Sequence, residues 1–299
     1  MKRYITGVFL LVGIAFLIVG CGNQNEHLAK GKELIKSDKR RKEERAVHEF
    51  KLAIEQEKDN AEAHYLLGFY DSQDFYELNE PEWNQASIAQ RGQHMFKAYQ
   101  QKPREYLEIL VFDTLRDDDV DVQNAALEAL TLVYQKGERK LLLNQLEKAI
   151  KSKDNRDRHD AQWVMANIGR SDPNTMVPIL VELLEHKQMG TRLNAVKALG
   201  EIGSEEAIPV LAALIDSGSA RRVRDREVAE VRQLAVAALG KIGGKAVPEL
   251  VKITQNKGSS LRVDAIRALS SLGDEKAVQP LLDALNEKSS REIVVELGN

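Results

Sequence analysis

The second half of this chain repeats itself, and this repetition constrains its fold more than any other feature. Five segments share one pattern of small and apolar residues. They are VQNAALEALTLV (122–133), DRHDAQWVMANIG (157–169), TRLNAVKALGEIG (191–203), VRQLAVAALGKIG (231–243) and LRVDAIRALSSLG (261–273). Their aligned alanines are Ala126, Ala161, Ala195, Ala235 and Ala265, at spacings of 35, 34, 40 and 30 residues. A period of this length indicates a stack of similar structural units.

Each copy predicts a pair of helices. In the third copy Ala195, Ala198, Leu199 and Ile202 recur at helical spacing, so they form one apolar face. A glycine follows each of four copies and predicts a left-handed helix end at Gly169, Gly203, Gly243 and Gly273. A second apolar run comes next, and proline is expected early in that helix, at Pro178, Pro209 and Pro248.

This pattern closely resembles HEAT repeats of the short kind found in phycobilin lyases. The resemblance covers roughly residues 120–299, and SSREIVVELGN (289–299) is similar to the truncated start of a sixth copy. It implies an all-α solenoid, because two short helices bury both apolar faces only by stacking on neighbouring pairs. The resemblance is specific for the fold and says little about activity, because binding scaffolds dominate the family.

An arginine recurs at one position of the first helices, at Arg158, Arg192, Arg232 and Arg262, with Gln123 in the first copy. One interpretation is a ladder that binds a ligand. We favour a structural ladder that pairs with Asp or Glu between repeats, since arginine suits a fixed bidentate pair.

The long spacing of 40 residues marks an insertion, DSGSARRVRDREVAEVRQ (216–233). Insertions in solenoids map to loops, often on a binding face. Arg221, Arg222 and Arg224 are therefore candidate contacts for an acidic partner or a lipid headgroup, against the alternative of a solvated charged loop. Trp83, in an irregular stretch before the repeats, is a further candidate for partner binding, whereas Trp163 is expected in the core.

The N-terminus is predicted to direct export. Lys2 and Arg3 precede an uncharged run of 16 residues, ITGVFLLVGIAFLIVG (5–20), which is short for a membrane span. The sequence Ile18-Val19-Gly20-Cys21 resembles a bacterial lipobox, which implies cleavage before Cys21 and lipidation of its thiol and amine. The alternative is an uncleaved signal anchor. Gly22 in place of aspartate resembles the signal for the outer membrane, facing the periplasm in a Gram-negative cell.

Between the anchor and the repeats, residues 21–45 are predicted to form a tether with a charged linker or helix. Ala46, Phe50 and Ala53 then share one helical face, Asp59-Asn60 breaks the pattern, and Tyr65, Leu67 and Gly68 follow. This junction resembles the second helix of one tetratricopeptide (TPR) repeat entering the next, although Lys58 replaces the usual proline. We assign 46–116 to a TPR-like region and 117–299 to the HEAT-like domain.

Composition excludes several functions. Lys and Arg total 43 against 46 Asp and Glu, a formal charge of −3, which argues against nucleic-acid binding. One cysteine excludes an intramolecular disulfide framework. The sequence holds no catalytic motif, so we expect no cofactor and no metal. Asp117-Asp118-Asp119 with Asp121 lacks calcium-loop spacing, so helix capping is favoured over calcium.

The sequence therefore predicts a non-catalytic lipoprotein scaffold that binds envelope proteins, with residues 1–20 as its signal peptide. A second hypothesis is an enzyme-associated function similar to that of the phycobilin lyases. A third is an envelope protein that binds lipid or peptidoglycan.

Overall fold

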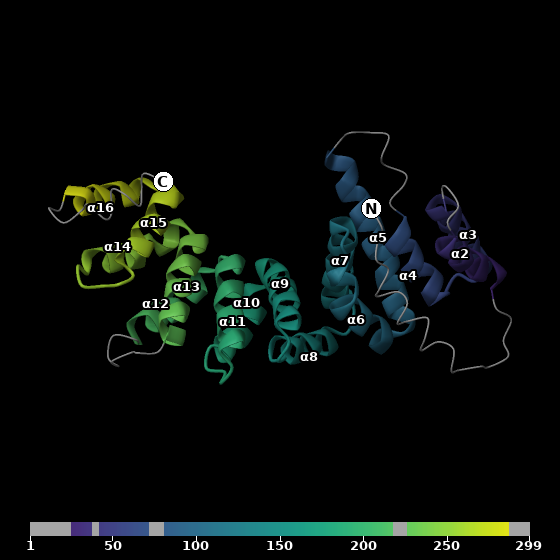
Figure 1. The fold of residues 1–299 in the computed structure, drawn as a ribbon, viewed down its shortest axis with the longest axis horizontal. Helices are drawn as coiled ribbons and strands as arrows, with labels where there is room; N and C mark the ends of the chain where they lie inside the picture. The colour runs from purple at the N-terminus through teal and green to yellow at the C-terminus, as the bar shows by residue number, and fades with distance from the viewer. Residues whose placement is uncertain (1–24, 38–41, 72–80, 218–225, 287–299) are drawn as a thin grey trace. The chain divides into compact units, whose positions relative to one another are not determined.

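A computed structural model of the chain describes residues 25–37, 42–71, 81–217 and 226–286. Over these ranges the chain forms fifteen α-helices and three short 3-10 segments, without a β-strand (Figure 1). The all-α prediction is therefore confirmed. The helices group into two compact units, unit 1 (residues 1–146) and unit 2 (residues 147–299).

Unit 1 is built from helices that pack on their neighbours in chain order, α2 on α3, α3 on α4, α4 on α5 and α5 on α7. Their bounds are α2 Glu26–Lys36, α3 Lys42–Gln56, α4 Ala61–Tyr70, α5 Pro81–Gln101, α6 Pro103–Phe112 and α7 Val120–Lys136. Helix α8, Arg139–Ile150, crosses the boundary between the units. The predicted break at Asp59-Asn60 is confirmed, because the Asn60 side chain caps α4 by accepting from the Ala63 N–H.

The junction that resembles a TPR repeat is a tight helical contact. Phe50 and Ala53 of α3 are fully buried. Gly68 of α4 lies so close to α5 that a Cβ there would sit 2.7 Å from the Arg91 carbonyl oxygen. In the charged stretch, Gly31 and Ile35 of α2 are buried, so α2 belongs to the packed helices of unit 1. The assignment to the TPR family stays a prediction.

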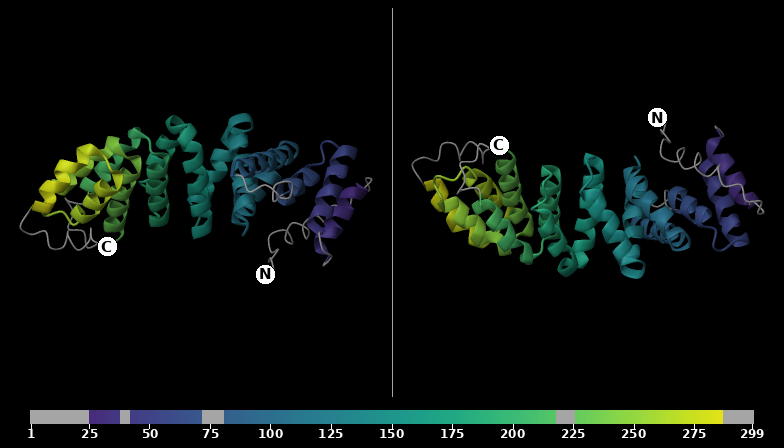
Figure 2. Two further views of the ribbon diagram at one scale, coloured as in Figure 1. Left: turned by 90° about the horizontal axis from the view of Figure 1, so that it is seen from above. Right: turned by 90° about the horizontal axis from the view of Figure 1, so that it is seen from below.

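Unit 2 consists of paired helices in regular succession. The pairs are α9 Asn155–Ser171 with α10 Pro173–Leu183, α11 Met189–Ile202 with α12 Ile208–Ser217, α13 Arg226–Ile242 with α14 Val247–Gln255, and α15 Arg262–Leu272 with α16 Glu275–Asn286. The first helices pack in sequence, α9 on α11, α11 on α13 and α13 on α15, so the pairs follow one another side by side (Figure 2). All four aligned alanines of unit 2 are fully buried.

Two local predictions in the repeats are wrong in one copy. Gly203, Gly243 and Gly273 have positive φ after their helices, but Gly169 lies inside α9. A Cβ on Gly169 would meet the Ile202 side chain at 2.4 Å, so this glycine permits a close approach between helices. Pro209 and Pro248 lie at the start of α12 and α14 as predicted. Pro178 instead lies inside α10, because that helix begins one turn earlier, at Pro173.

Trp163 is the third correction, because it is only half-buried. The equivalent residues of the next three copies are Lys197, Ala237 and Arg267, and all three are exposed. Trp163 therefore lies on the outward stripe of α9 rather than in the core.

Candidate functional site

The recurring arginines share one kind of contact. Each reaches a backbone carbonyl that precedes its own helix. Arg192 Nη1 donates to the carbonyls of His186 and Lys187 at 2.9 and 3.1 Å. Arg232 Nε donates to the Ile215 carbonyl at 2.7 Å, and Arg262 Nε to the Thr254 carbonyl at 2.8 Å.

Arg158 is the most buried of the four and makes the most contacts of this kind. Its Nη1 donates to the carbonyls of Ser152, Lys153 and Asp154, and its Nη2 to the Asn155 side chain at 3.0 Å. Arg158 and Arg192 therefore close the loops that enter their helices, whereas Arg232 and Arg262 hold the last turn of the preceding second helix. The acidic partner expected between repeats is present for Arg192, which lies 3.1 Å from Glu227 of the next copy.

A second set of polar contacts joins successive first helices, and the sequence analysis missed it. Glu201 of α11 lies at its centre. Its carboxylate accepts from Gln162 of α9 at 2.7 Å and pairs with Lys241 of α13 at 3.3 Å. Arg170 of α9 also donates to the Glu201 carbonyl at 3.1 Å. Position 201 is glutamate in the third copy and lysine in the fourth, and this change of charge at one repeat position was the available signal.

The second helices of unit 2 expose a different stripe. One position of three successive copies is an exposed proline, Pro178, Pro209 and Pro248. One turn later the exposed residues are Glu182, Ala213 and Lys252. We call these six residues the second-helix stripe. It is small, partly apolar and nearly neutral, so it lacks the positive charge of a nucleic-acid-binding face.

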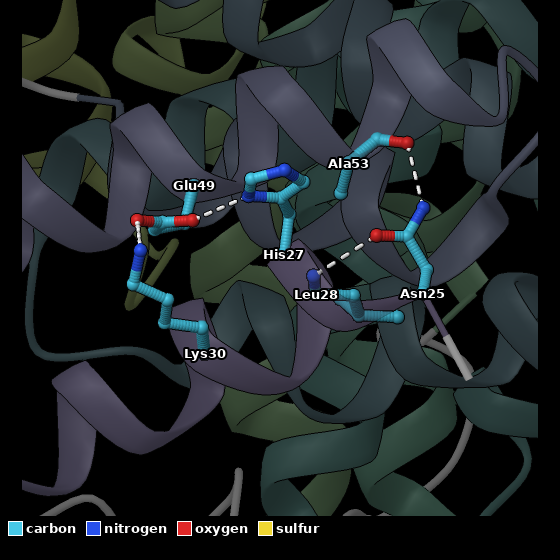
Figure 3. Close-up of polar contacts among 6 residues, drawn as sticks. All are labelled: Asn25, His27, Leu28, Lys30, Glu49 and Ala53. Atoms are coloured by element: carbon cyan, nitrogen blue, oxygen red, sulfur yellow. Dashed lines mark hydrogen bonds and ion pairs between the residues drawn. The ribbon is translucent and has the colours of Figure 1, made fainter.

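In unit 1 the clearest polar cluster joins α2 to α3 (Figure 3). Glu49 of α3 is buried and lies against two side chains of α2, with His27 Nδ1 at 2.6 Å and Lys30 Nζ at 2.5 Å. Asn25 holds the start of α2, because its amide donates to the Ala53 carbonyl while its oxygen accepts from the Leu28 N–H. Burial raises the pKa of Glu49, but the hydrogen bonds from His27 and Lys30 outweigh burial, so the net pKa is lowered. The cluster joins the two helices around a carboxylate whose ionised form is favoured.

A pair of imidazoles joins α4 to α5. The rings of His64 and His94 stack with centroids 5.3 Å apart, and their Nδ1 atoms are 3.0 Å apart. His64 Nε2 must donate to the Lys58 carbonyl, 2.9 Å away, so His94 donates between the Nδ1 atoms. Burial lowers the pKa of both rings, that of His94 to about 4.

Arg91 of α5 is buried beside this pair and holds the end of α4, since it donates to the carbonyls of Gly68 and Phe69. The favoured role of the aspartate cluster is confirmed at Asp119, which caps α7 by accepting from the Asp121 N–H. The negative charges of Asp119 and Asp121 also oppose the lowering of the Arg91 pKa by burial.

The structure does not describe the side chains predicted from the sequence for lipidation and partner binding. Cys21 and its lipobox, and Arg221, Arg222 and Arg224, lie outside the described residues. Trp83 lies on α5, but its side chain is also outside the description. Among the described residues no helix is long and apolar enough to span a membrane. In the same ranges no group of three His, Cys, Asp or Glu residues could hold a metal ion.

Comparison with known proteins matches unit 2 most directly. A sequence profile of HEAT repeats matches residues 143–229 and 224–295, together just over half of the chain. The alpha subunit of a phycocyanobilin lyase from Picosynechococcus sp. is 29% identical over 139 residues. That alignment covers 44% of this chain and 52% of the relative, so the chain spans about half the length of the relative it matches.

Proposed function

Because this chain belongs to the HEAT-repeat family, we propose that it is a non-catalytic scaffold that binds other proteins along its repeats and is anchored by lipid in the bacterial cell envelope. The observation that carries the binding half is the second-helix stripe. Its prolines recur at one exposed position of three successive copies, and Ala213 lies exposed one turn after Pro209, so one partner can contact several repeats at once.

The polar groups of the first helices support this choice of face. Arg192 and Glu201 make contacts within the repeats or between them. Groups engaged in this way are less available to a partner, whereas Ala213 and the prolines offer surface that costs little to desolvate. We therefore place the docking face on the second helices.

Photo-crosslinking in intact cells tests this placement. A photoreactive amino acid replaces Ala213 on α12 or, as a matched control, the exposed Ala237 on the first helix α13. Ala213 is expected to capture a discrete envelope protein that mass spectrometry identifies, and Ala237 is not. Equal capture at both positions would remove the second-helix stripe from the proposal.

The anchor rests on the lipobox alone and needs its own experiment. Wild-type cells labelled with radioactive palmitate are expected to yield a labelled chain in the membrane fraction, and Cys21→Ala is expected to abolish both label and retention. An unlabelled wild-type chain contradicts the lipoprotein. If the chain is exported, Arg221, Arg222 and Arg224 are candidates for a second contact. Sedimentation with bare cell wall or liposomes would favour binding of lipid or peptidoglycan instead.

A second candidate function is bilin handling, and the similarity to the lyase subunit is what favours it. Mixing the purified chain with phycocyanobilin separates the two ideas. A shift in the bilin absorbance that saturates at one equivalent would support this function. We expect an unchanged spectrum, because fold similarity is a weak warrant for shared chemistry.

A further inference from the structure

Helix α16 carries an exposed apolar pair at the edge of unit 2. Val278 is 53% exposed and Leu282, one turn later, is 47% exposed. Among the described residues these are two of the three large apolar side chains with such exposure. They lie on the last helix of the described chain, and on the same helix Ala277 is buried and Leu281 packs on Ile266.

The same repeat positions are covered in the preceding copies. Val247 of α14 is equivalent to Val278 and is 3% exposed, while Leu250, equivalent to Leu281, is fully buried. Ala212 and Val251, equivalent to Leu282, are half-buried. Helix α14 lies against both α15 and α16, so the following copy is present to cover it. The pair on α16 thus has the sequence of a covered position without the neighbour that covers it.

We propose that residues 290–298 of this chain dock on α16 and cover Val278 and Leu282, in the way that α15 covers α14. The segment reads SREIVVELG and supplies four apolar residues, Ile293, Val294, Val295 and Leu297. Arg291 follows Arg262 by 29 residues, close to the 30 that separate Arg262 from Arg232, so the segment is in register with the repeat. Three residues separate its start from the end of α16, which is within the usual length of a helix-to-helix connection.

Covering the pair has a purpose in a solenoid. An uncovered apolar face on a repeat is a site for association with another copy of the chain. The segment has a composition suited to covering it, because Arg291, Glu292 and Glu296 are interspersed with its apolar residues.

Amide hydrogen exchange on the full chain tests the proposal. In the wild type the peptide covering 289–299 is expected to exchange at least tenfold slower than its unstructured rate. The double variant Val278→Asp/Leu282→Asp is expected to abolish this protection. As a matched control, Lys276→Asp changes an exposed residue on the opposite side of α16 and should leave the protection unchanged.

A second variant guards against loss of α16 itself. Ile293→Asp/Val294→Asp leaves the described helices untouched and is expected to increase exchange of the peptide over α16, while peptides from α11 and α13 keep the wild-type rate. An unprotected segment in the wild type overturns the proposal. So does protection that survives both double variants, or protection that grows with protein concentration, since the last result would assign the face to a second copy of the chain.

Discussion

The helices of the two units pack through different kinds of side chain. Fifteen of the sixteen Phe, Tyr and Trp residues of the chain precede residue 147, and the exception is the half-buried Trp163. The core of unit 1 therefore uses rings such as Phe50, Tyr65 and Tyr106, whereas unit 2 uses Ala, Leu, Ile and Val. Small side chains allow successive helices of unit 2 to keep the same spacing, because each repeat fills a layer of the same thickness. Large rings fit one place only, so the core of unit 1 is not periodic.

Buried polar groups follow the same division. In unit 1 each has an individual partner, as Glu49 has His27 and Lys30, and Arg91 has the end of α4. In unit 2 one solution recurs, an arginine that donates to a backbone carbonyl preceding its own helix. Because the partners in unit 1 are individual, we expect its stability to depend on single side chains. In unit 2 similar arginine contacts are spread over several repeats.

The largest expected effect tests the aromatic core. Phe50 is fully buried and its ring lies against Gly31 and the ring of Tyr70, 6.4 Å away between centroids. Phe50→Ala should lower the free energy of unfolding by about 3–5 kcal/mol, since it removes a buried ring and leaves a cavity between α2 and α3. Urea denaturation measures the loss, and exchange of the α2 and α3 peptides locates it.

The matched comparison in unit 2 is Leu199→Ala, which also empties a fully buried site. It should cost about 2–4 kcal/mol, because a smaller side chain is removed. A larger loss at Leu199 than at Phe50 would contradict the idea that unit 1 depends more heavily on single residues.

The next effect concerns acid. The folded-state pKa of His94 is about 4 and that of His64 is lowered, both below 6.5, so the unfolded chain binds protons first as the pH falls. Stability conferred by the neutral pair is complete above about pH 6.5 and is lost progressively down to about pH 4. The loss is on the order of 2–3 kcal/mol. The positive charges of Lys97 and Lys51 also lower the pKa of the imidazoles, by repelling a protonated ring. The negative charge of Asp59 opposes this lowering at His64.

Denaturation of unit 1 between pH 7 and 4, followed through the near-ultraviolet signal of its tyrosines, measures this change. His94→Gln should flatten the dependence over that window. His159→Gln, on an exposed ring of unit 2, should leave it unaltered. Glu49 acts in a separate window, since its folded pKa is lowered and its contribution is lost only below about pH 4.5. A profile that is flat from pH 7 to 5 would refute the role of the imidazole pair.

Close packing of small residues in unit 2 gives the third prediction. A Cβ on Gly200 would lie 2.8 Å from both the Cα and the Cβ of Ala238, so α11 and α13 would have to separate. Gly200→Val should cost about 2–3 kcal/mol through overpacking. Thermal unfolding measures it, with Gly258→Val as the control, because Gly258 has only one neighbour near a Cβ, at 3.7 Å. Equal shifts for the two variants would count against close packing.

Periodic features of the fold could be predicted from the sequence, and individual contacts could not. The alanines of the repeats and the cap at Asn60 follow from local patterns, since burial and capping depend on near neighbours along the helix. Gly169 and Trp163 follow the same repeat but behave differently. Gly169 accommodates Ile202 from another helix, and Trp163 takes an outward position, so only the packed neighbours reveal their roles.

The same limit applies to the candidate site. The recurring arginines were visible as a set, but no pattern identifies their acceptors, which are a loop carbonyl for Arg192 and carbonyls in the last turn of the preceding helix for Arg232 and Arg262. The pairs Glu49 with His27, and His64 with His94, join residues 22 and 30 positions apart. They have no repeat to single them out, so sequence reasoning missed both.

The smallest expected effect separates a structural arginine from one that serves a ligand. Arg192→Met removes two bonds to loop carbonyls and the ion pair with Glu227, but keeps the apolar stem. The expected loss in the free energy of unfolding is about 1–2 kcal/mol, because the carbonyls of His186 and Lys187 lose their donor. Water can replace that donor in part. Arg267→Met, on an exposed residue of α15, should change stability by less than about 0.5 kcal/mol. The opposite outcome is that Arg192→Met keeps full stability and yet loses the protein captured at Ala213. That result would assign the arginine series to the docking face. The division between a structural first-helix face and a binding second-helix face would then fail.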